Sequence, residues 1–134
     1  AHALQGALDD GEREVRIAAA RALSALRYTP ARAALEAAVA SKRLLREADL
    51  TERIAFFEAF GSVAGEAGVA ELDRILNGKS WLGRREDPET RACAALGLSR
   101  AGLPAARKAL AAASADPDPV VRSAVGRAIR GMDA

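Results

Sequence analysis

The stretch Glu12-Arg13-Glu14-Val15-Arg16-Ile17-Ala18-Ala19-Ala20-Arg21-Ala22-Leu23 decides the fold, because its pattern occurs four times in the 134-residue chain. Each copy has an acidic residue, an arginine four positions later, small residues two and six positions after the arginine, and a large apolar residue seven positions after it. Intervals of 37, 38 and 31 residues separate the four arginines, which are Arg16, Arg53, Arg91 and Arg122. Self-similarity at a period of about 20 to 50 residues is the signature of a stacked-repeat protein. The chain is therefore predicted to be a solenoid.

Each copy of the pattern predicts one amphipathic helix. Apolar or small residues lie two, three, six, seven and ten positions after the arginine, which places them on one face of a helix with 3.6 residues per turn. The pairs Asp87-Pro88 and Asp118-Pro119 supply an N-cap acceptor followed by a residue suited to the first helical turn. Gly102 and Gly131 are expected to end the third and fourth helices as left-handed C-caps. The four helices are predicted at 12–27, 50–64, 88–101 and 119–130.

Partner helices are predicted between these four. One begins at Thr29-Pro30, one ends at Asn77-Gly78, one begins at Pro104, and residues 2–8 have the pattern of a helix end. No segment alternates strictly between apolar and polar residues, as a half-buried strand would. The sequence therefore predicts an all-α fold, an α-α superhelix of about four antiparallel helix pairs. A single domain is expected, with repeats at approximately 1–27, 28–64, 65–102 and 103–134, and the stack is expected to continue before residue 1.

The repeated pattern Asp-x-x-Val-Arg-x-x-Ala-x-x-x-Leu resembles the HEAT repeat, in particular the bacterial HEAT-like repeats of the phycobilisome-lyase type. Residues 12–23 and 118–129 carry it, whereas Glu52 and Thr90 stand where the middle copies would have valine. The resemblance implies a HEAT-like solenoid in which each arginine and the acid before it form a ladder between neighbouring repeats. The alternative role for these arginines is a grip on a phosphate backbone. The expected ladder consists of Arg16, Arg53, Arg91, Arg122, Glu12, Asp49, Asp87 and Asp118.

The composition fits a helical stack and limits the function classes. Half of the residues are hydrophobic, many of them alanine, the strongest helix former. With 20 basic and 18 acidic residues the net charge is +2, too small an excess to imply nucleic acid by itself. Cys93 is the only cysteine, so the chain forms no internal disulfide and no cysteine-based metal site, and we expect Cys93 in the core. The preference for arginine over lysine, the absence of a membrane-spanning run and the absence of a signal peptide favour a bacterial cytoplasmic protein.

Two connections, 41–48 and 78–86, are longer than the others and form the first candidate site. They occupy the same place in consecutive repeats, so stacking is expected to bring them together on one edge. Their apolar residues Leu44, Leu45, Trp81 and Leu82 either fill the groove between repeats or face a partner. Arginine and tryptophan are enriched at binding hot spots. The candidate partner-binding edge consists of Lys42, Arg43, Arg46, Lys79, Trp81, Arg84 and Arg85.

The concave face is the second candidate site. In stacked helix pairs the helix that carries the repeated arginine usually lines the inner curve. Phe57 beside Leu96 would form an apolar spot for the apolar face of a helical ligand, unless Phe57 turns inward to fill the core. The candidate concave face consists of Arg21, Phe57, Leu96, Arg127 and Arg130.

No set of residues indicates catalysis. His2 is the only histidine and stands at the start of the chain. The stretch Asn77-Gly78-Lys79-Ser80 imitates the end of a phosphate-binding loop, but Asp73 occupies the position of the required earlier glycine. We therefore expect no catalytic residue, metal or cofactor, and a non-catalytic interaction or scaffold module that binds a protein or acidic peptide and no membrane. Three alternatives stay open: a nucleic-acid-binding helical-repeat domain, a chromophore-lyase-like subunit, and a structural or regulatory arm of a larger bacterial protein.

Overall fold

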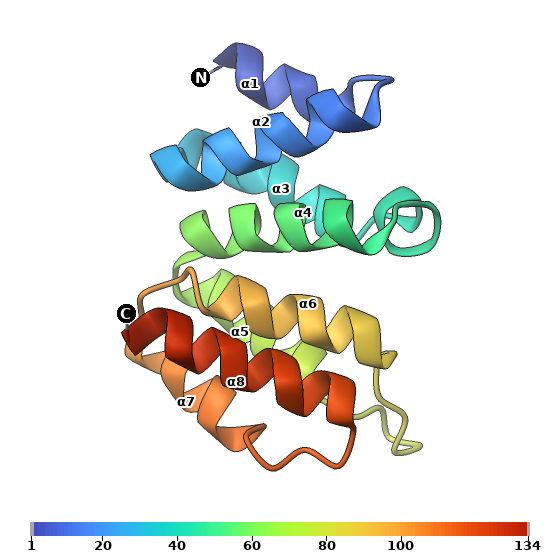
Figure 1. Cartoon of the computed structure of the whole chain (residues 1–134), viewed down its shortest axis with the longest axis vertical. Helices are drawn as coiled ribbons and strands as arrows, with labels where there is room; N and C mark the ends of the chain where they lie inside the picture. The colour runs from blue at the N-terminus through green and yellow to red at the C-terminus, as the bar shows by residue number, and fades with distance from the viewer. Residues whose placement is uncertain (1, 134) are drawn as a thin grey trace.

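The computed structural model describes residues 2–133, in which helices stack along one long axis from the N-terminal to the C-terminal end (Figure 1). These residues contain no strand, and the predicted all-α architecture of antiparallel helix pairs is confirmed. Short 3-10 segments, η1 (Ala7–Asp9) and η2 (Thr29–Ala31), and a π-helical turn, η3 (Arg43–Glu47), lie between the α-helices. The α-helices are α1 (His2–Gly6), α2 (Arg13–Leu26), α3 (Arg32–Val39), α4 (Leu50–Val63), α5 (Gly65–Asn77), α6 (Pro88–Leu98), α7 (Pro104–Ala112) and α8 (Pro119–Asp133).

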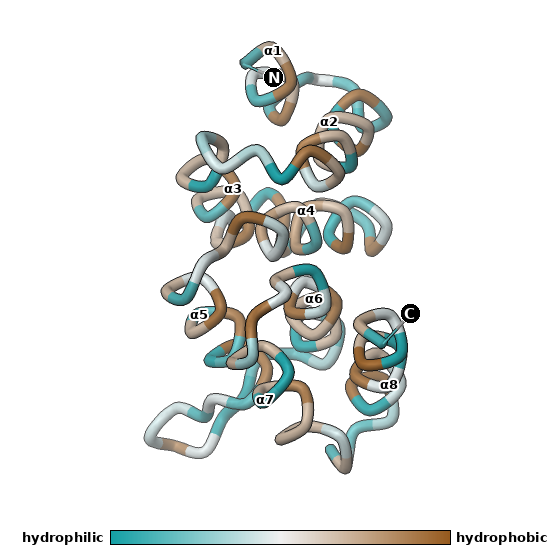
Figure 2. Tube along the Cα trace, turned by 90° about the vertical axis from the view of Figure 1, so that its left-hand side faces the viewer, coloured by the Kyte–Doolittle hydropathy of each residue, from teal (hydrophilic) through white to brown (hydrophobic). Residues whose placement is uncertain are grey.

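The helices form two layers. The four helices that carry the repeated arginine, α2, α4, α6 and α8, pack in succession, and α3, α5 and α7 lie beside them as their partners (Figure 2). None of the helices in residues 2–133 is long and apolar enough to cross a lipid bilayer.

Aspartates begin three of the arginine-bearing helices. Asp49 accepts a hydrogen bond from the amide of Glu52 at 3.0 Å, and Asp87 accepts one from the amide of Thr90 at 3.1 Å. Asp118 accepts from two amides at the start of α8, at 2.8 and 3.2 Å. These bonds satisfy amides that have no partner within the helix, and a carboxylate there also interacts favourably with the helix dipole.

The predicted helix ends are partly wrong. Gly102 has a φ of +70° and reverses the chain after α6, but α6 itself stops at Leu98, before the predicted residue 101. Gly131 lies inside α8, which continues to Asp133. Glycine permits a left-handed turn without imposing one, so it ends a helix only where the chain has to reverse.

Phenylalanines and glycines shape the centre of the stack. Phe56, Phe57 and Phe60 on α4 are fully buried. One turn further on, α4 crosses α6 so closely that a Cβ on Gly61 would lie 1.9 Å from the carbonyl oxygen of Gly97. Large side chains thus fill the space between the layers, and two glycines let the arginine-bearing helices approach each other.

Candidate functional site

An arginine ladder connects successive repeats. Arg16 on α2 donates two hydrogen bonds to Glu52 on α4, at 2.8 and 3.1 Å. Arg53 on α4 donates to Glu89 on α6 at 2.7 Å. In both pairs the acid follows the arginine by 36 residues, which is about one repeat. These bonds therefore join α2 to α4 and α4 to α6.

The third and fourth arginines bond elsewhere. Arg91 is buried and forms an ion pair with Asp116 in the connection between α7 and α8. Arg122 donates to the backbone carbonyl of Asp116 at 2.8 Å. Arg122 therefore bonds within its own repeat.

The acids that the resemblance implied are not those that the ladder uses. Asp49, Asp87 and Asp118 cap their own helices, and Asp49 also accepts from Arg13 at 2.7 Å. Glu12 is exposed, and its amide donates to Asp10. The expected pairing is corrected for a geometric reason: an acid four positions before the arginine lies at the N-cap, where the amides of its own helix are the nearest donors.

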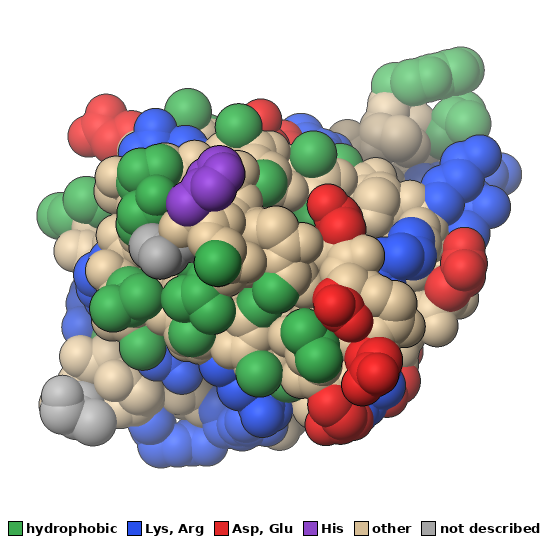
Figure 3. All heavy atoms as spheres, turned by 90° about the horizontal axis from the view of Figure 1, so that it is seen from above, with side chains coloured by type: hydrophobic (Ala, Val, Ile, Leu, Met, Phe, Trp, Pro, Cys, Tyr) green, Lys and Arg blue, Asp and Glu red, His purple; other side chains and the backbone are tan. Residues whose placement is uncertain are grey.

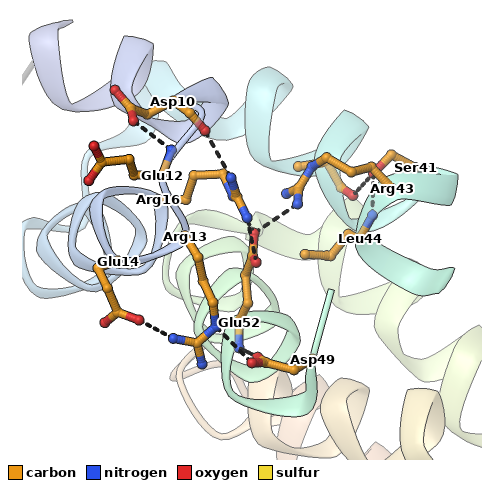
Figure 4. Close-up of polar contacts among 11 residues, drawn as sticks. Asp10, Glu12, Arg13, Glu14, Arg16, Ser41, Arg43, Leu44, Asp49 and Glu52 are labelled. Carbon is orange, nitrogen blue, oxygen red and sulfur yellow. Dashed lines mark hydrogen bonds and ion pairs between the residues drawn. The ribbon is translucent and has the colours of Figure 1, made fainter. Parts of the chain in front are cut away.

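Glu52 is the most buried carboxylate of the ladder, with a side chain 1% exposed, and a second arginine reaches it. Arg43 from the first long turn pairs with Glu52 at 2.9 Å, on the side opposite Arg16 (Figure 4). The Arg43 guanidinium also lies 5.7 Å from the ring centre of Phe56. Burial alone would raise the pKa of Glu52, but the bonds from Arg16 and Arg43 outweigh it and hold the pKa below its ordinary value.

Asp116, in the connection between α7 and α8, holds the second long turn as Glu52 holds the first. It pairs with Arg91 and, at 3.9 Å, with Arg85. Burial alone would raise its pKa, whereas the bond from Arg91 contributes to a pKa below the ordinary value. Each long turn is thus attached to the stack by one arginine that shares a buried carboxylate with a ladder arginine. Arg43 and Arg85, assigned to the candidate edge, have this attachment role in the structure.

The apolar residues of the first long turn are buried or partly buried, and those of the second are exposed, so each of the two alternatives (filling the space between repeats or facing a partner) applies to one turn. Leu44 is fully buried and Leu45 partly buried, so the first turn packs into the core. Trp81 and Leu82 in the second turn are exposed. Leu45 and Glu86 line one hollow of about 500 Å³ beside Arg74, so both turns reach the same edge. The exposed cations of that edge are Lys42, Arg46, Lys79, Arg84 and Arg85.

The concave face carries a groove of about 500 Å³ that crosses α4, α6 and α8. Phe57, assigned to this face, is fully buried, because with Phe56 and Phe60 it fills the core behind α4. Leu96 and Arg127 do line the groove. Its complete lining is Leu50, Ile54, Glu89, Ala92, Cys93, Leu96, Pro119, Val120, Ser123, Ala124 and Arg127.

A more basic hollow of about 360 Å³ adjoins the groove, because Leu96 and Arg127 line both. Arg27, Arg100 and Glu58 line it further, and Arg100 lies 3.3 Å from Glu58. Arg27 also donates to the carbonyl of Arg100 at 2.9 Å, a bond that the repeat pattern did not predict. Arg21 and Arg130, the remaining residues of the predicted concave face, are exposed and line neither cavity.

The groups with chemical reactivity are few. Burial raises the pKa of the Cys93 thiol to about 12, so the thiol at the floor of the groove is protonated at neutral pH. His2 lies on α1, away from the groove. Across residues 2–133, no three His, Cys, Asp or Glu side chains are grouped so that they could hold a metal ion. The groove offers apolar side chains together with one acid, Glu89, and one base, Arg127.

Comparison with known proteins gives a structural relative. No family model matches the sequence, and no curated protein does. Among solved structures, human deoxyhypusine hydroxylase in complex with glycerol is similar, with a TM-score of 0.60 and 26% sequence identity. The alignment covers 98% of this chain and 43% of the hydroxylase chain, so this chain spans less than half of that protein.

This similarity corrects the functional expectation. The hydroxylase is an enzyme, which contradicts the prediction of a non-catalytic module with no enzymatic role. The prediction rested on the lack of a recognisable catalytic motif. A helical-repeat fold by itself indicates neither the presence nor the absence of catalysis, so that lack was weak evidence. The hydroxylase is also a helical protein that contains HEAT repeats, which agrees with the repeat pattern read from the sequence. At this level of description, the chain has a HEAT-like helical-repeat fold.

Proposed function

We propose that this chain is part of an enzyme and that its groove across α4, α6 and α8 holds a polypeptide substrate of that enzyme. The observation that carries the proposal is the groove itself, in a fold similar to a hydroxylase along almost the whole chain. We further propose that the repeats are of the bacterial HEAT-like type, on the motif in residues 12–23 and 118–129.

The composition of the groove supports a polypeptide as the bound molecule. Leu50, Ile54 and Val120 offer apolar contacts along it, and Glu89 and Arg127 offer one charge of each sign. Ligand pockets for small molecules normally enclose most of the ligand, whereas a groove open across several helices fits an amphipathic segment whose apolar side chains are spaced along one face.

The electrostatics of the groove support a defined orientation of that segment. Glu89 is held by Arg53 from the outside of the groove, so its position is fixed before a ligand binds. Arg127 lies where the groove meets the basic hollow lined by Arg27 and Arg100. An amine or other cation of the segment is expected near Glu89, and a carboxylate near Arg127.

The first substrate to test is a peptide that contains deoxyhypusine, because the name of the similar hydroxylase gives deoxyhypusine as the group that it hydroxylates. Fluorescence anisotropy would compare its binding with that of the same peptide carrying lysine. The proposal predicts tighter binding of the deoxyhypusine peptide. Mass spectrometry of the peptide after incubation with dioxygen and a two-electron reductant would test for hydroxylation separately from binding. One oxygen atom would be added to the peptide, and the other would leave as water.

The groove can be tested with a matched pair of valine substitutions. Val120 lines the groove and is 49% exposed, whereas Val15 lies at the start of α2 outside the groove and is 37% exposed. Val120→Glu removes apolar contact and adds charge, so it should weaken peptide binding about tenfold, equivalent to about 1.4 kcal/mol. Val15→Glu should leave binding unchanged. Equal binding by the two variants, or by the deoxyhypusine and lysine peptides, would overturn the proposal.

A further inference from the structure

The loop between α5 and α6, residues 78–87, exposes two adjacent large hydrophobic side chains. Trp81 is 92% exposed and Leu82 is 60% exposed. The loop projects at the edge of the molecule (Figure 1), and from above the N-terminal end a projection with a hydrophobic tip is seen at that edge, next to Lys and Arg side chains (Figure 3). An apolar tip held in water is unfavourable unless another surface covers it.

Hydrogen bonds within the loop give this tip a defined conformation. The amide of Ser80 donates to the carbonyl of Arg84 at 2.8 Å, and the amide of Gly83 donates to the carbonyl of Ser80 at 2.8 Å. The Ser80 hydroxyl accepts from the amides of Leu82 and Arg84, at 3.3 and 3.1 Å. Gly83 has a φ of +79°, which a side chain would disfavour. The tip is thus presented in advance, with little conformational entropy left to lose on binding.

Both ends of the loop are attached to the stack. At the start, the amide of Gly78 donates to the carbonyl of Arg74 at 2.8 Å. At the end, Arg85 pairs with the buried Asp116, which Arg91 also holds. The loop therefore projects as a fixed element of the fold.

The charges around the tip are mainly positive. Lys79 and Arg84 flank it in the sequence, and the first long turn, which contains Lys42 and Arg46, lies on the same side of the molecule (Figure 1). None of these four cations takes part in an ion pair within residues 2–133. A hollow of about 350 Å³ at the base of the loop is lined by Arg74, Gly78, Lys79, Ser80, Arg84, Arg85 and Glu86.

We propose that this loop docks the protein onto an anionic lipid surface, with Trp81 and Leu82 entering the headgroup region and Lys79 and Arg84 contacting lipid phosphates. The tip is convex and lies outside the hollow at its base, so it requires a surface that accepts a projection without a matching pocket. Tryptophan favours the membrane interface, and lysine and arginine are attracted to anionic headgroups. Docking of this kind is contact from one side of the bilayer.

The acidic residues of the same edge define the conditions for docking. Glu47 and Glu86 are exposed there and reduce the positive field. We therefore expect that neither the apolar tip alone nor the cations alone are sufficient for membrane binding, because stable peripheral anchoring usually needs two signals. The proposal is independent of the peptide-binding groove, which lies on α4, α6 and α8 and shares no residue with the loop.

Trp81 is the only tryptophan, so its fluorescence reports on the tip directly. Vesicles of phosphatidylserine and phosphatidylcholine should shift the emission of Trp81 to shorter wavelength and sediment the protein, and raised salt should reverse both effects. Vesicles of phosphatidylcholine alone should do neither. No shift with the anionic vesicles, or an equal shift with both kinds, would overturn the proposal.

Matched charge reversals separate the loop from a general effect of net charge. The double variant Lys79→Glu/Arg84→Glu should bind anionic vesicles at least tenfold more weakly than the control double variant Arg21→Glu/Lys108→Glu, which reverses two exposed cations elsewhere. Circular dichroism should show unchanged helix content in both, since Lys79 and Arg84 lie in a loop without helix and Arg21 and Lys108 are exposed on the surfaces of their helices. Equal vesicle binding by the two variants would overturn the proposal. An emission shift caused by polyglutamate and by no vesicle would overturn it in favour of an acidic polypeptide.

Discussion

Replacing Glu52 by glutamine tests the ion-pair network that holds the stack together. The substitution keeps the size of the side chain but removes the charge between Arg16 and Arg43, which lie 2.8 and 2.9 Å from the carboxylate. Removing one partner of a fully buried ion pair costs about 3 to 5 kcal/mol. Both arginines are partly exposed and can be rehydrated, so we expect a loss of about 2 to 3 kcal/mol in the free energy of unfolding.

Urea denaturation would measure this loss as a lower midpoint with an unchanged m-value. The matched control is Glu89→Gln, because Glu89 also accepts from a ladder arginine, Arg53, but is 53% exposed. An exposed pair is worth about 0 to 1 kcal/mol, so the control should unfold close to the natural protein. If the two variants were equally stable, the reasoning from burial would be refuted.

The pH dependence gives an independent check on Glu52. Its pKa is lower in the folded protein than in the unfolded chain, where glutamate titrates near about 4.3. The folded state therefore gains stability from this group above that pH, and loses it as the pH falls through the folded pKa. The difference in stability between the natural protein and Glu52→Gln should be full at pH 7 and shrink below about pH 4.3. A difference that stays constant down to acidic pH would contradict the assignment.

Three further predictions concern the core, the thiol and the exposed loop. Gly61→Ala should destabilise the protein by about 3 kcal/mol or more in urea denaturation, since its Cβ would lie 1.9 Å from the carbonyl oxygen of Gly97. The control Gly131→Ala places its Cβ in open space, so it should be neutral or stabilise the protein by up to about 1 kcal/mol. The thiol of Cys93 should react with a disulfide reagent only after urea unfolds the chain, because it is buried and its pKa is raised to about 12; rapid reaction in the native state would contradict its burial. Trp81→Ala should leave the free energy of unfolding within about 0.5 kcal/mol of the natural value, since the side chain is exposed, and a larger loss would show that the loop contributes to the core.

The helices could be read from the sequence because their signals are local. The spacing around Arg16 fixes the buried face of α2, and the aspartates before α4, α6 and α8 mark their first turns. The ends were less predictable, as Gly131 shows, because a C-cap depends on whether the chain has to reverse there.

The sequence predicted that the repeated arginines bond acids between repeats, but it did not predict which acids. The acid nearest in the sequence, four positions before each arginine, is used for capping, and the acid that accepts the arginine lies one repeat away. A signal for it is present in the sequence: Asp49, Glu52 and Glu89 follow Arg13, Arg16 and Arg53 by the same 36 residues. A constant separation close to the repeat length indicates contacts between equivalent helices.

The sites were the least predictable part. Composition could not separate Arg43 and Arg85, which bond buried acids, from Lys79 and Arg84, which do not, because the difference depends on contacts between repeats. The burial of Phe57 depends in the same way on how closely α4 and α6 approach each other. The proposal of an enzymatic role has no local sequence signal and rests on similarity to a solved enzyme structure.

Methyl NMR during titration with the deoxyhypusine peptide is the most direct test of the proposal that the groove holds the substrate. Ile54, Leu96 and Val120 line the groove, and Val15 on α2 serves as a reference within the same spectrum. The proposal predicts saturable shifts of the three groove methyls with Val15 unmoved. Shifts confined to other methyls, or no shift at saturating peptide, would contradict it.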